Sequence, residues 1–250
     1  MDRRQIRNFA YAFMLLAVAC GDGESYDSIK LSEPVRTDGM VKPVAAVAST
    51  SRLYVLDEKK SKLFLFDAEG KLVKAVGGDG SGKTAFSSPR GLALGPDGRV
   101  FVADTDNSRV QILSPEGDFL GSFGARGSQA GQLRDPQSVS VGQDGRVYVA
   151  DTGNNRVQVF TEEGILLFQI GESGKEAGQF RAPTRVVVDP SDEVYVLDSG
   201  NERIEKFDAS AKFVKSFAAS GSDFVVDGYG YLYVLDGRNG KVAELNAAGA

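Results

Sequence analysis

Three polar patterns in this chain have the residue types and spacing that chemistry needs. The string GGDGSGKT at Gly77–Thr84 formally matches the phosphate-binding pattern G-x-x-x-x-G-K-[ST]. A set of Asp, Asn and Arg residues recurs at constant spacing, as in Asp104, Asn107 and Arg109. Adjacent carboxylates are groups that acid–base catalysis or a hard metal ion uses, and the pairs are Glu162–Glu163, Asp57–Glu58 and Asp192–Glu193. What each pattern can do depends on the elements that position it.

The chain repeats itself with a period of 47 residues. The segment that begins RVFVADTDNSRVQI at Arg99 returns at Arg146 and Glu193, and related segments begin at Arg52 and Tyr231. Each unit alternates apolar and polar residues between Asp-Gly or Glu-Gly turns, which predicts an antiparallel four-stranded meander. A repeat of about 40–50 residues with four strands is typical of a β-propeller blade.

The spaced residues of this unit resemble the NHL repeat. The string P-x-G-L-A-x, followed by D-G-R-V-[FY]-V-A-D-T-x-N-x-R-V-Q-[IV], occupies Pro89–Ile112 and Pro136–Val159. Pro183–Lys206 departs from it, with Glu205 at the Gln position. The resemblance implies an all-β propeller of four-stranded antiparallel blades, related to six-bladed TolB-like and NHL propellers.

We count five blades, in repeats of about 43–77, 89–124, 136–171, 183–218 and 222–246. The fifth ends after a third strand at Lys241–Leu245, whereas Ser25–Leu31 supplies one extra strand before the first blade. We expect the extra strand to pair with the fifth blade, because a closed ring leaves no open sheet edge. The alternative is a chain truncated from six blades.

The N-terminus reads as an export signal. Basic residues precede an apolar stretch of ten at Ala10–Ala19, which is too short for a membrane-spanning helix of about 20 residues. It ends in LAVAC, which resembles a bacterial lipobox and predicts lipidation of Cys20; an ordinary secretory signal is the alternative. We therefore expect residues 1–19 to be a lipoprotein signal peptide, 20–42 a tether with the ring-closing strand, and 43–250 the propeller. The expected location is the bacterial cell envelope, lipid-anchored to a membrane and facing the periplasm or cell surface.

Composition removes several classes of function. The 250 residues include no histidine and one cysteine, so the commonest general base and a Cys–His zinc site are excluded. The net charge is −5, and loss of the signal peptide, with three Arg and one Asp, makes it −7. An acidic, exported protein is a poor binder of nucleic acid. We expect no cofactor and no metal.

The repeat also decides how the phosphate-binding string is interpreted. Its sister segments are Gly124–Leu133 and Gly171–Phe180, which carry Ala130 and Ala177 in place of Lys83. No helical pattern follows the string, so backbone amides have no helix N-terminus to join in holding phosphate. We interpret it as a glycine-rich linker between blades and expect no nucleotide.

The Asp–Asn–Arg set has two interpretations. A ligand seldom shares the symmetry of a propeller, which favours a structural role: Asp and Asn shape the turn, and Asp pairs with Arg across the hairpin. The alternative is a charged ring around the channel that binds a polar ligand. The paired carboxylates are expected in turns open to water, with ordinary pKa values. The set comprises Asp104, Asn107, Arg109, Asp151, Asn154, Arg156, Asp198, Asn201 and Arg203.

Function is expected where the blades differ. Near the start of the first strands, beside the channel mouth, the units carry the unlike residues Arg90, Gln137, Arg185 and Asp223. They predict either a polar rim that binds a partner or solvated residues with no ligand. The favoured function is a non-enzymatic binding or scaffold module for a protein, peptide or glycan partner. The alternative is a metal-dependent lyase or lactone hydrolase of the propeller type that uses Asp, Glu and Asn oxygen ligands.

Overall fold

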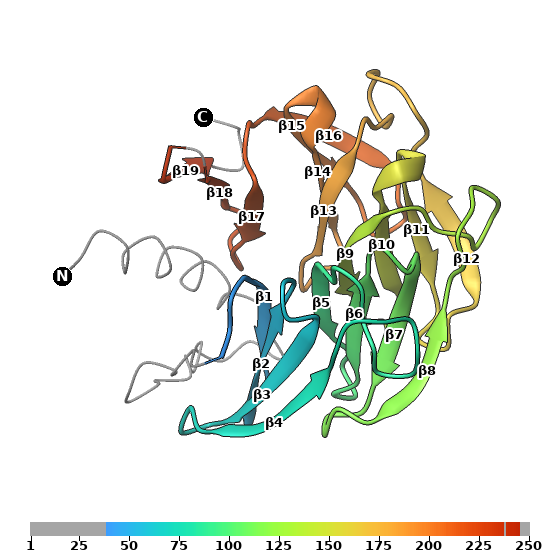
Figure 1. Ribbon diagram of the computed structural model, residues 1–250. Coiled ribbons are helices and arrows are strands. Elements are labelled where there is room, and N and C mark those ends of the chain that lie inside the picture. Colours follow the sequence, from blue (N-terminus) through green and yellow to red (C-terminus); the bar gives the residue numbers. More distant parts are fainter. Residues whose placement is uncertain (1–38, 238, 246–250) are drawn as a thin grey trace.

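The computed structural model describes residues 39–237 and 239–245, which form five antiparallel sheets arranged around a centre (Figure 1). We call the sheets blades one to five. Blade one contains β1 (Pro43–Ala48), β2 (Arg52–Asp57), β3 (Lys62–Asp67) and β4 (Leu72–Gly77). Blade two contains β5 (Gly91–Leu94), β6 (Val100–Asp104), β7 (Arg109–Leu113) and β8 (Phe119–Phe123). Blade three contains β9 (Pro136–Val141), β10 (Val147–Asp151), β11 (Arg156–Phe160) and β12 (Leu166–Ile170). Blade four contains β13 (Pro183–Val188), β14 (Val194–Asp198), β15 (Arg203–Phe207) and β16 (Phe213–Ala218). Blade five contains β17 (Asp223–Val226), β18 (Leu232–Asp236) and β19 (Lys241–Leu245).

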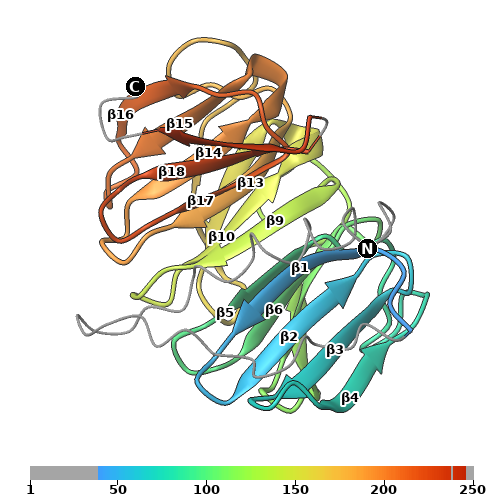
Figure 2. The same cartoon turned by 90° about the vertical axis from the view of Figure 1, so that its left-hand side faces the viewer.

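The blades pack on one another in chain order. The first strands follow one another around the centre, with β1 against β5, β5 against β9, β9 against β13 and β13 against β17. Figure 2 shows blades four and five on the side of the molecule away from blade one. Blades two, three and four are therefore covered on two faces by described residues, which is why every residue of β6, β10 and β14 is buried.

Apolar side chains fill the spaces between neighbouring blades. Leu56 and Leu63 of blade one pack against Val100 and Val102 of blade two in one buried cluster. Equivalent clusters lie between blades two and three, three and four, and four and five. The alternation of side chains along each strand sends successive residues to opposite faces, so one strand contributes to two of these clusters. Hydrophobic burial between blades thus holds the ring together.

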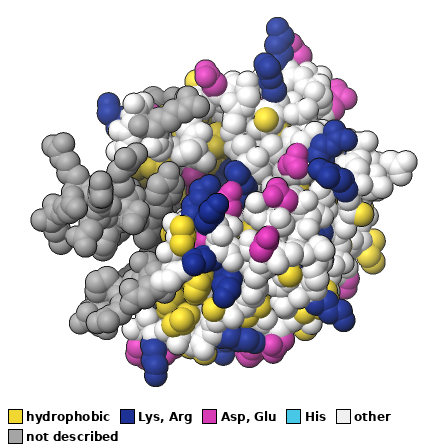
Figure 3. All heavy atoms as spheres, in the orientation of Figure 1, with side chains coloured by type: hydrophobic (Ala, Val, Ile, Leu, Met, Phe, Trp, Pro, Cys, Tyr) yellow, Lys and Arg dark blue, Asp and Glu magenta, His cyan; other side chains and the backbone are white. Residues whose placement is uncertain are grey.

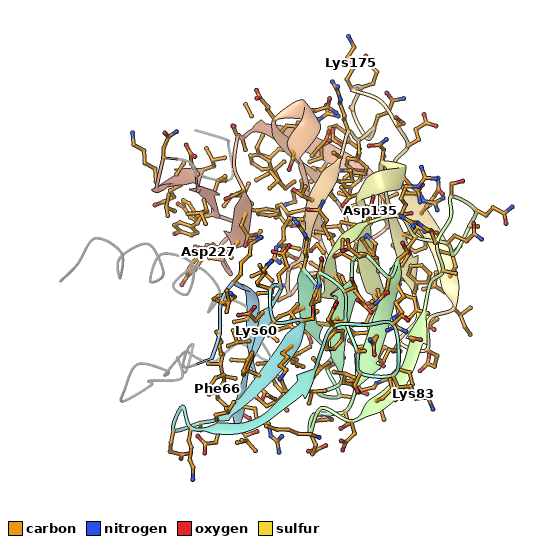
Figure 4. All side chains as sticks on the ribbon, in the orientation of Figure 1. Lys60, Phe66, Lys83, Asp135, Lys175 and Asp227 are labelled. Atoms are coloured by element: carbon orange, nitrogen blue, oxygen red, sulfur yellow. The ribbon has the colours of Figure 1, made fainter. Side chains whose placement is uncertain are left out.

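Glycine-rich linkers join the fourth strand of one blade to the first strand of the next. Lys83, Asp135 and Lys175, labelled in Figure 4, lie in the three linkers of blades two to four. Each linker makes a parallel bridge that buries an apolar side chain completely, as between Asp79 and Phe86. We call this buried residue the plug of the linker, and the plugs of the next two linkers are Leu133 and Phe180.

The predicted fold is confirmed: the described residues form an all-β, five-bladed propeller in which blades one to four are four-stranded antiparallel sheets. The fifth blade has three described strands, in the order β17-β18-β19. The predicted closing strand Ser25–Leu31 and the predicted lipidation site Cys20 lie outside the described residues. Within the part of the chain that the structure describes, no helix has the length and apolar character to cross a membrane.

Candidate functional site

The carboxylate of Asp151 shows what the repeated polar set does. Its Oδ1 accepts a hydrogen bond from the backbone N of Arg134 at 2.7 Å. Its Oδ2 accepts from Arg156 Nε at 2.8 Å, Asn154 Nδ2 at 2.9 Å and Gln158 Nε2 at 3.1 Å. Asp151 is completely buried. Its acceptor sites are occupied by groups of its own blade and of the preceding linker, which leaves none for a ligand.

The basic member of the set also faces the linker. Arg156 Nη2 donates to the carbonyl oxygens of Gln129 at 2.9 Å and Gln132 at 3.0 Å. Asn154 Nδ2 donates to the carbonyl oxygen of Gly127 at 2.9 Å. Asp151 and Arg156 form the ion pair expected across the hairpin. In addition, the set in blade three binds the glycine-rich linker to the turn between β10 and β11.

The same contacts recur in blades two and four. Asp104 Oδ1 accepts from Ser87 N at 2.7 Å, and Asp198 Oδ1 accepts from Arg181 N at 2.6 Å. Both carboxylates are completely buried. The remaining partners of Asp104 are Asn107, Arg109 and Gln111, and those of Asp198 are Asn201 and Arg203.

Blade four differs from its sisters at one buried position. Glu205 replaces the glutamine of the sister blades and is completely buried; its oxygens lie 3.1 Å from Arg203 Nη2 and 3.2 Å from Gly178 N. Burial raises the pKa of Glu205, and the nearby charge of Asp198 adds to the rise. Arg203, the Gly178 amide and the Ser216 hydroxyl lower it in part. A carboxylate therefore occupies a place where the sister side chains donate hydrogen bonds.

The segment that matches the phosphate-binding pattern uses its amides within the fold. Gly78 N donates to Ser61 O at 2.8 Å, and Gly80 N donates to Phe86 O at 3.0 Å. Thr84 N donates to Gln111 Oε1 at 3.1 Å. Strand β5 follows the segment, and no helix lies between them. The geometry is that of a linker, in which the amides of Gly78, Gly80 and Thr84 are bonded within the fold.

Three of the four residues predicted at the channel mouth take part in two contacts at different blade interfaces. Arg185 Nε lies 3.0 Å from Asp223 Oδ1, which joins blades four and five. Arg90 Nη2 donates to Glu58 Oε1 at 3.0 Å, which joins blades two and one. Gln137 is half-buried at an irregularity of β9, where the register shifts.

Sequence reasoning named Glu58 only as one of the paired carboxylates and missed its ion pairs with Arg90 and Lys42. Glu58 follows the buried Asp of its blade, a position held by Thr105 and Thr152 in blades two and three. Those hydroxyls donate to the carbonyl of the first proline in the next blade, at 2.8 and 2.7 Å. Blade one thus has an ion pair with blade two where blades two and three have a neutral hydrogen bond to the next blade. Comparing the residue after each repeated Asp would have found it.

The opposite face, which carries the Asp-Gly turns, holds an open pocket of about 290 Å³. Glu162 lies in its wall and bonds to Arg99. Burial raises the pKa of Glu162, and the nearby charge of Asp97 adds to the rise. The remaining lining residues are Asp144, Gly145, Arg146, Thr161, Glu163 and Leu167.

The expectation that the paired carboxylates are open to water is wrong for Glu162 and for Asp57, the first member of the pair Asp57–Glu58. Glu162 is largely enclosed by the neighbouring turn and has a raised pKa, and Asp57 is completely buried. Contacts with neighbouring segments enclose Glu162 and bury Asp57. The alternation of residues within one repeat does not reveal such contacts. Among the described residues, no group of three or more Asp, Glu, Cys or His side chains could hold a metal ion.

Comparison with known proteins agrees with this geometry. The family model of the NHL repeat matches residues 86–113, 133–160 and 180–207. Three of the blades carry NHL repeats. Each match begins at the buried apolar residue of a linker and ends at the last residue of the third strand of the following blade. The NHL resemblance predicted from the sequence is thereby confirmed for blades two to four.

Solved propellers of similar shape diverge widely in sequence. A structure of streptogramin B lyase has a TM-score of 0.63 at 15% identity, covering 83% of this chain and 66% of its own. Virginiamycin B lyase from Staphylococcus aureus has a TM-score of 0.65 at 13% identity, covering 84% of this chain and 68% of its own. A gluconolactonase from Xanthomonas campestris has a TM-score of 0.60 at 18% identity, covering 78% and 69%. The chain thus spans about two thirds of the first two structures, and these likenesses show the fold alone. No curated protein matches it in sequence.

Proposed function

We propose that this protein is a lipid-anchored, extracytoplasmic NHL propeller that binds a protein, peptide or glycan partner at the mouth of its channel. The observation that carries the proposal is the Arg185–Asp223 contact at 3.0 Å, together with its counterpart between Arg90 and Glu58. These charges do not repeat from blade to blade, and their side chains are partly exposed, from 12% to 43%. A polar partner can therefore exchange contacts with them.

Charge placement supports this choice of face. The repeated Asp carboxylates are buried and fully hydrogen-bonded, so they offer nothing to a partner. Acidic and basic side chains lie side by side near the middle of the face seen in Figure 3. A mixed surface of this kind selects a partner by complementary charge and fixes its orientation, because like charges brought together are costly.

Photo-crosslinking in the envelope tests the binding face. A photoreactive residue at Arg90 is expected to capture a defined partner, and the same residue at Arg99 on the opposite face is the matched control. Arg90→Ala, combined with Arg185→Ala, should abolish capture by a probe placed at Gln137. Equal capture from both faces would contradict the proposal.

Lipidation of Cys20 has its own test. Cells fed a labelled fatty acid are expected to label the wild-type protein and to leave Cys20→Ala unlabelled. The substituted protein should move from the membrane fraction to the soluble fraction, because two or more acyl chains are needed for stable anchoring. A labelled Cys20→Ala protein, or an unlabelled wild type, would overturn this part.

The metal-dependent lyase or lactone hydrolase stays the alternative. Lyases and a gluconolactonase are among the structurally similar proteins, at identities that carry the fold alone. The described residues supply no observation that favours such a metal centre. Calcium titration of the purified protein separates the two functions: a saturable rise in Tm with bound calcium would favour the enzyme.

A further inference from the structure

The loops at the two ends of the blades differ in charge. The turn face carries the loops between the first and second strands and between the third and fourth strands of each blade. The linker face carries the linkers and the loops between the second and third strands. Among the described residues, the turn-face loops contain twelve acidic and four basic side chains. The linker-face loops, together with residues 39–42, contain seven acidic and nine basic side chains. The linker face is thus the end that attracts an anionic partner, although the whole chain is acidic.

Arg134 and Arg181 occupy the same position in the linkers that enter blades three and four. Each directly follows the plug of its linker, Leu133 or Phe180. Asp135, labelled in Figure 4, marks the place of the first arginine. Both arginines are exposed, and neither side chain forms an ion pair or a hydrogen bond with a described residue. Their guanidinium donors are therefore available to an anion.

A glycine in the neighbouring 3₁₀ turn makes room for each arginine. Gly153 N donates to Arg134 O at 2.9 Å, and Gly200 N donates to Arg181 O at 2.8 Å. A Cβ at Gly153 would lie 2.5 Å from Arg134 Cγ, and one at Gly200 would lie 2.7 Å from Arg181 Cγ. The arginine stems therefore pack directly over the glycines. A side chain whose stem is already held in place loses less conformational freedom on binding.

Blade two shows that the arginine and the glycine are not required by the repeat. Ser87 stands at the position of the two arginines, and Asp106 stands at that of the two glycines. Asp106 N still donates to Ser87 O at 3.1 Å, and Ser87 N still donates to Asp104. The linker thus keeps its backbone contacts without an arginine. Those contacts do not account for the two arginines of blades three and four.

The two arginines lie beside the mouth of the channel. The 3₁₀ turns over which they pack, Thr152–Asn154 and Ser199–Asn201, contact the first strands β9 and β13. Gln137 and Arg185, on those strands, follow the arginines by three and four residues. Blades three and four are neighbours, so the two arginines belong to one side of the rim.

We propose that Arg134 and Arg181 bind two carboxylates of an acidic peptide segment in the partner, one on each blade. This inference rests on the proposed function and names the chemistry of its partner. A guanidinium group matches a carboxylate in charge and in the geometry of its paired donors.

The mixed charge of the rim favours a peptide over an anionic glycan. Asp223 lies beside Arg185, and a densely anionic glycan would bring its charges against that carboxylate at a cost. A peptide with two spaced acidic side chains avoids this repulsion. Its main-chain N–H groups can also donate to Asp223.

Titration with labelled peptides tests the two arginines. A fluorescein-labelled peptide of alternating glutamate and glycine is expected to bind the purified protein, as followed by fluorescence anisotropy, and its glutamine counterpart should not. Arg134→Gln and Arg181→Gln should each weaken binding about five-fold, and together about 25-fold, because each removes one exposed charged contact. Absence of binding by the acidic peptide overturns the proposal. Tighter binding of polygalacturonate, a carboxylated glycan, overturns the choice of a peptide.

A matched pair of lysines on the turn face controls for net charge. Lys71 and Lys212 are exposed and form no ion pair with a described residue. Lys71→Gln combined with Lys212→Gln removes the same charge and should leave the affinity for the acidic peptide unchanged. Equal losses in the two double variants would show that only net charge acts, and would overturn the site. Thermal unfolding should give similar Tm values for both double variants and the wild type, which shows that each is folded.

Blade two allows a gain of binding to be tested. Ser87→Arg combined with Asp106→Gly should create a third arginine of the same kind and raise the affinity for the acidic peptide at least about two-fold. An unchanged affinity overturns the role of the arginine and glycine as a pair.

Photo-crosslinking in the envelope separates this inference from the proposed function. The photoreactive residue at Arg90 should capture about five-fold less partner when Arg134→Gln and Arg181→Gln are both present. Undiminished capture overturns the acidic-peptide site and leaves the binding face standing. If the wild type captures no partner while the acidic peptide binds through both arginines, the proposed function fails and the site stands.

Discussion

Arg203 Nη2 lies 3.1 Å from Glu205 Oε1 inside blade four, at a position where blades two and three carry glutamine. In those blades the glutamine amide donates to a linker carbonyl, as Gln158 Nε2 does to Gln132 O at 2.6 Å. A carboxylate cannot donate that bond unless it is protonated. Arg203 donates to the corresponding carbonyl, that of Gln179, at 2.6 Å. Blade four therefore holds its linker with one donor fewer.

Glu205→Gln is expected to stabilise the protein at neutral pH by about 1 kcal/mol, because the amide restores the missing donor and removes a buried charge. The folded-state pKa of Glu205 is raised by burial. Its contribution is therefore full below the unfolded pKa, about 4.3, and is lost as pH rises through the folded value. Urea unfolding from pH 4 to 8 measures both effects. A Glu205→Gln protein that is less stable than wild type at pH 8 would contradict this account.

Asp151→Ala is expected to cost about 3–5 kcal/mol of unfolding free energy. The substitution leaves Arg156 and the Arg134 amide without their buried acceptor, and removal of one partner from a buried pair is strongly destabilising. Asp118→Ala is the control, because Asp118 is 71% exposed and pairs only with Lys74 among the described ion pairs. That change should stay within about 0.5 kcal/mol. Urea denaturation measures the unfolding free energy of both variants. Equal losses would show that the buried contacts of Asp151 do not stabilise the fold.

Arg185 and Asp223 are expected to couple weakly. A double-mutant cycle with Arg185→Gln and Asp223→Asn should give a coupling of about 0.5–1 kcal/mol, because partly exposed ion pairs are screened by water. Raising the salt concentration should reduce the coupling further. A coupling above about 2 kcal/mol would mean that the pair is a structural bond between blades four and five, less available to a partner.

Two glycines with nearly the same backbone conformation separate strain from packing. Gly171→Ala, at φ +75°, would place its Cβ 2.3 Å from the ring of Phe180, whereas Gly178→Ala, at φ +78°, meets nothing within 4 Å. Both substitutions place a Cβ on a left-handed backbone conformation, which costs about 1 kcal/mol. Only Gly171→Ala should add an overpacking cost of about 1–3 kcal/mol. Thermal unfolding of the two variants measures the difference. Similar decreases in Tm would contradict the tight packing of Phe180 against Gly171.

Comparison between repeats was the strongest source of prediction from the sequence. Alternating apolar residues and turns at a 47-residue period indicated the four-stranded blades, because side-chain alternation and turn chemistry are local properties. The same comparison excluded a phosphate loop at Lys83, whose segment the structure describes as a linker. The ion pair of Glu58 was missed because its partner Arg90 is 32 positions away, in the next blade.

The features that repeat could be predicted from the sequence: all-β blades, their order, and the recurring polar set that begins with Asp104. The contacts of those side chains became visible only in the folded protein. Asp104 and Asp151 are buried because linkers fold back over them, and burial depends on contacts between segments distant in the chain. For the same reason, the ionisation of Glu205 and the pairing of Arg90 with Glu58 depend on how neighbouring elements pack.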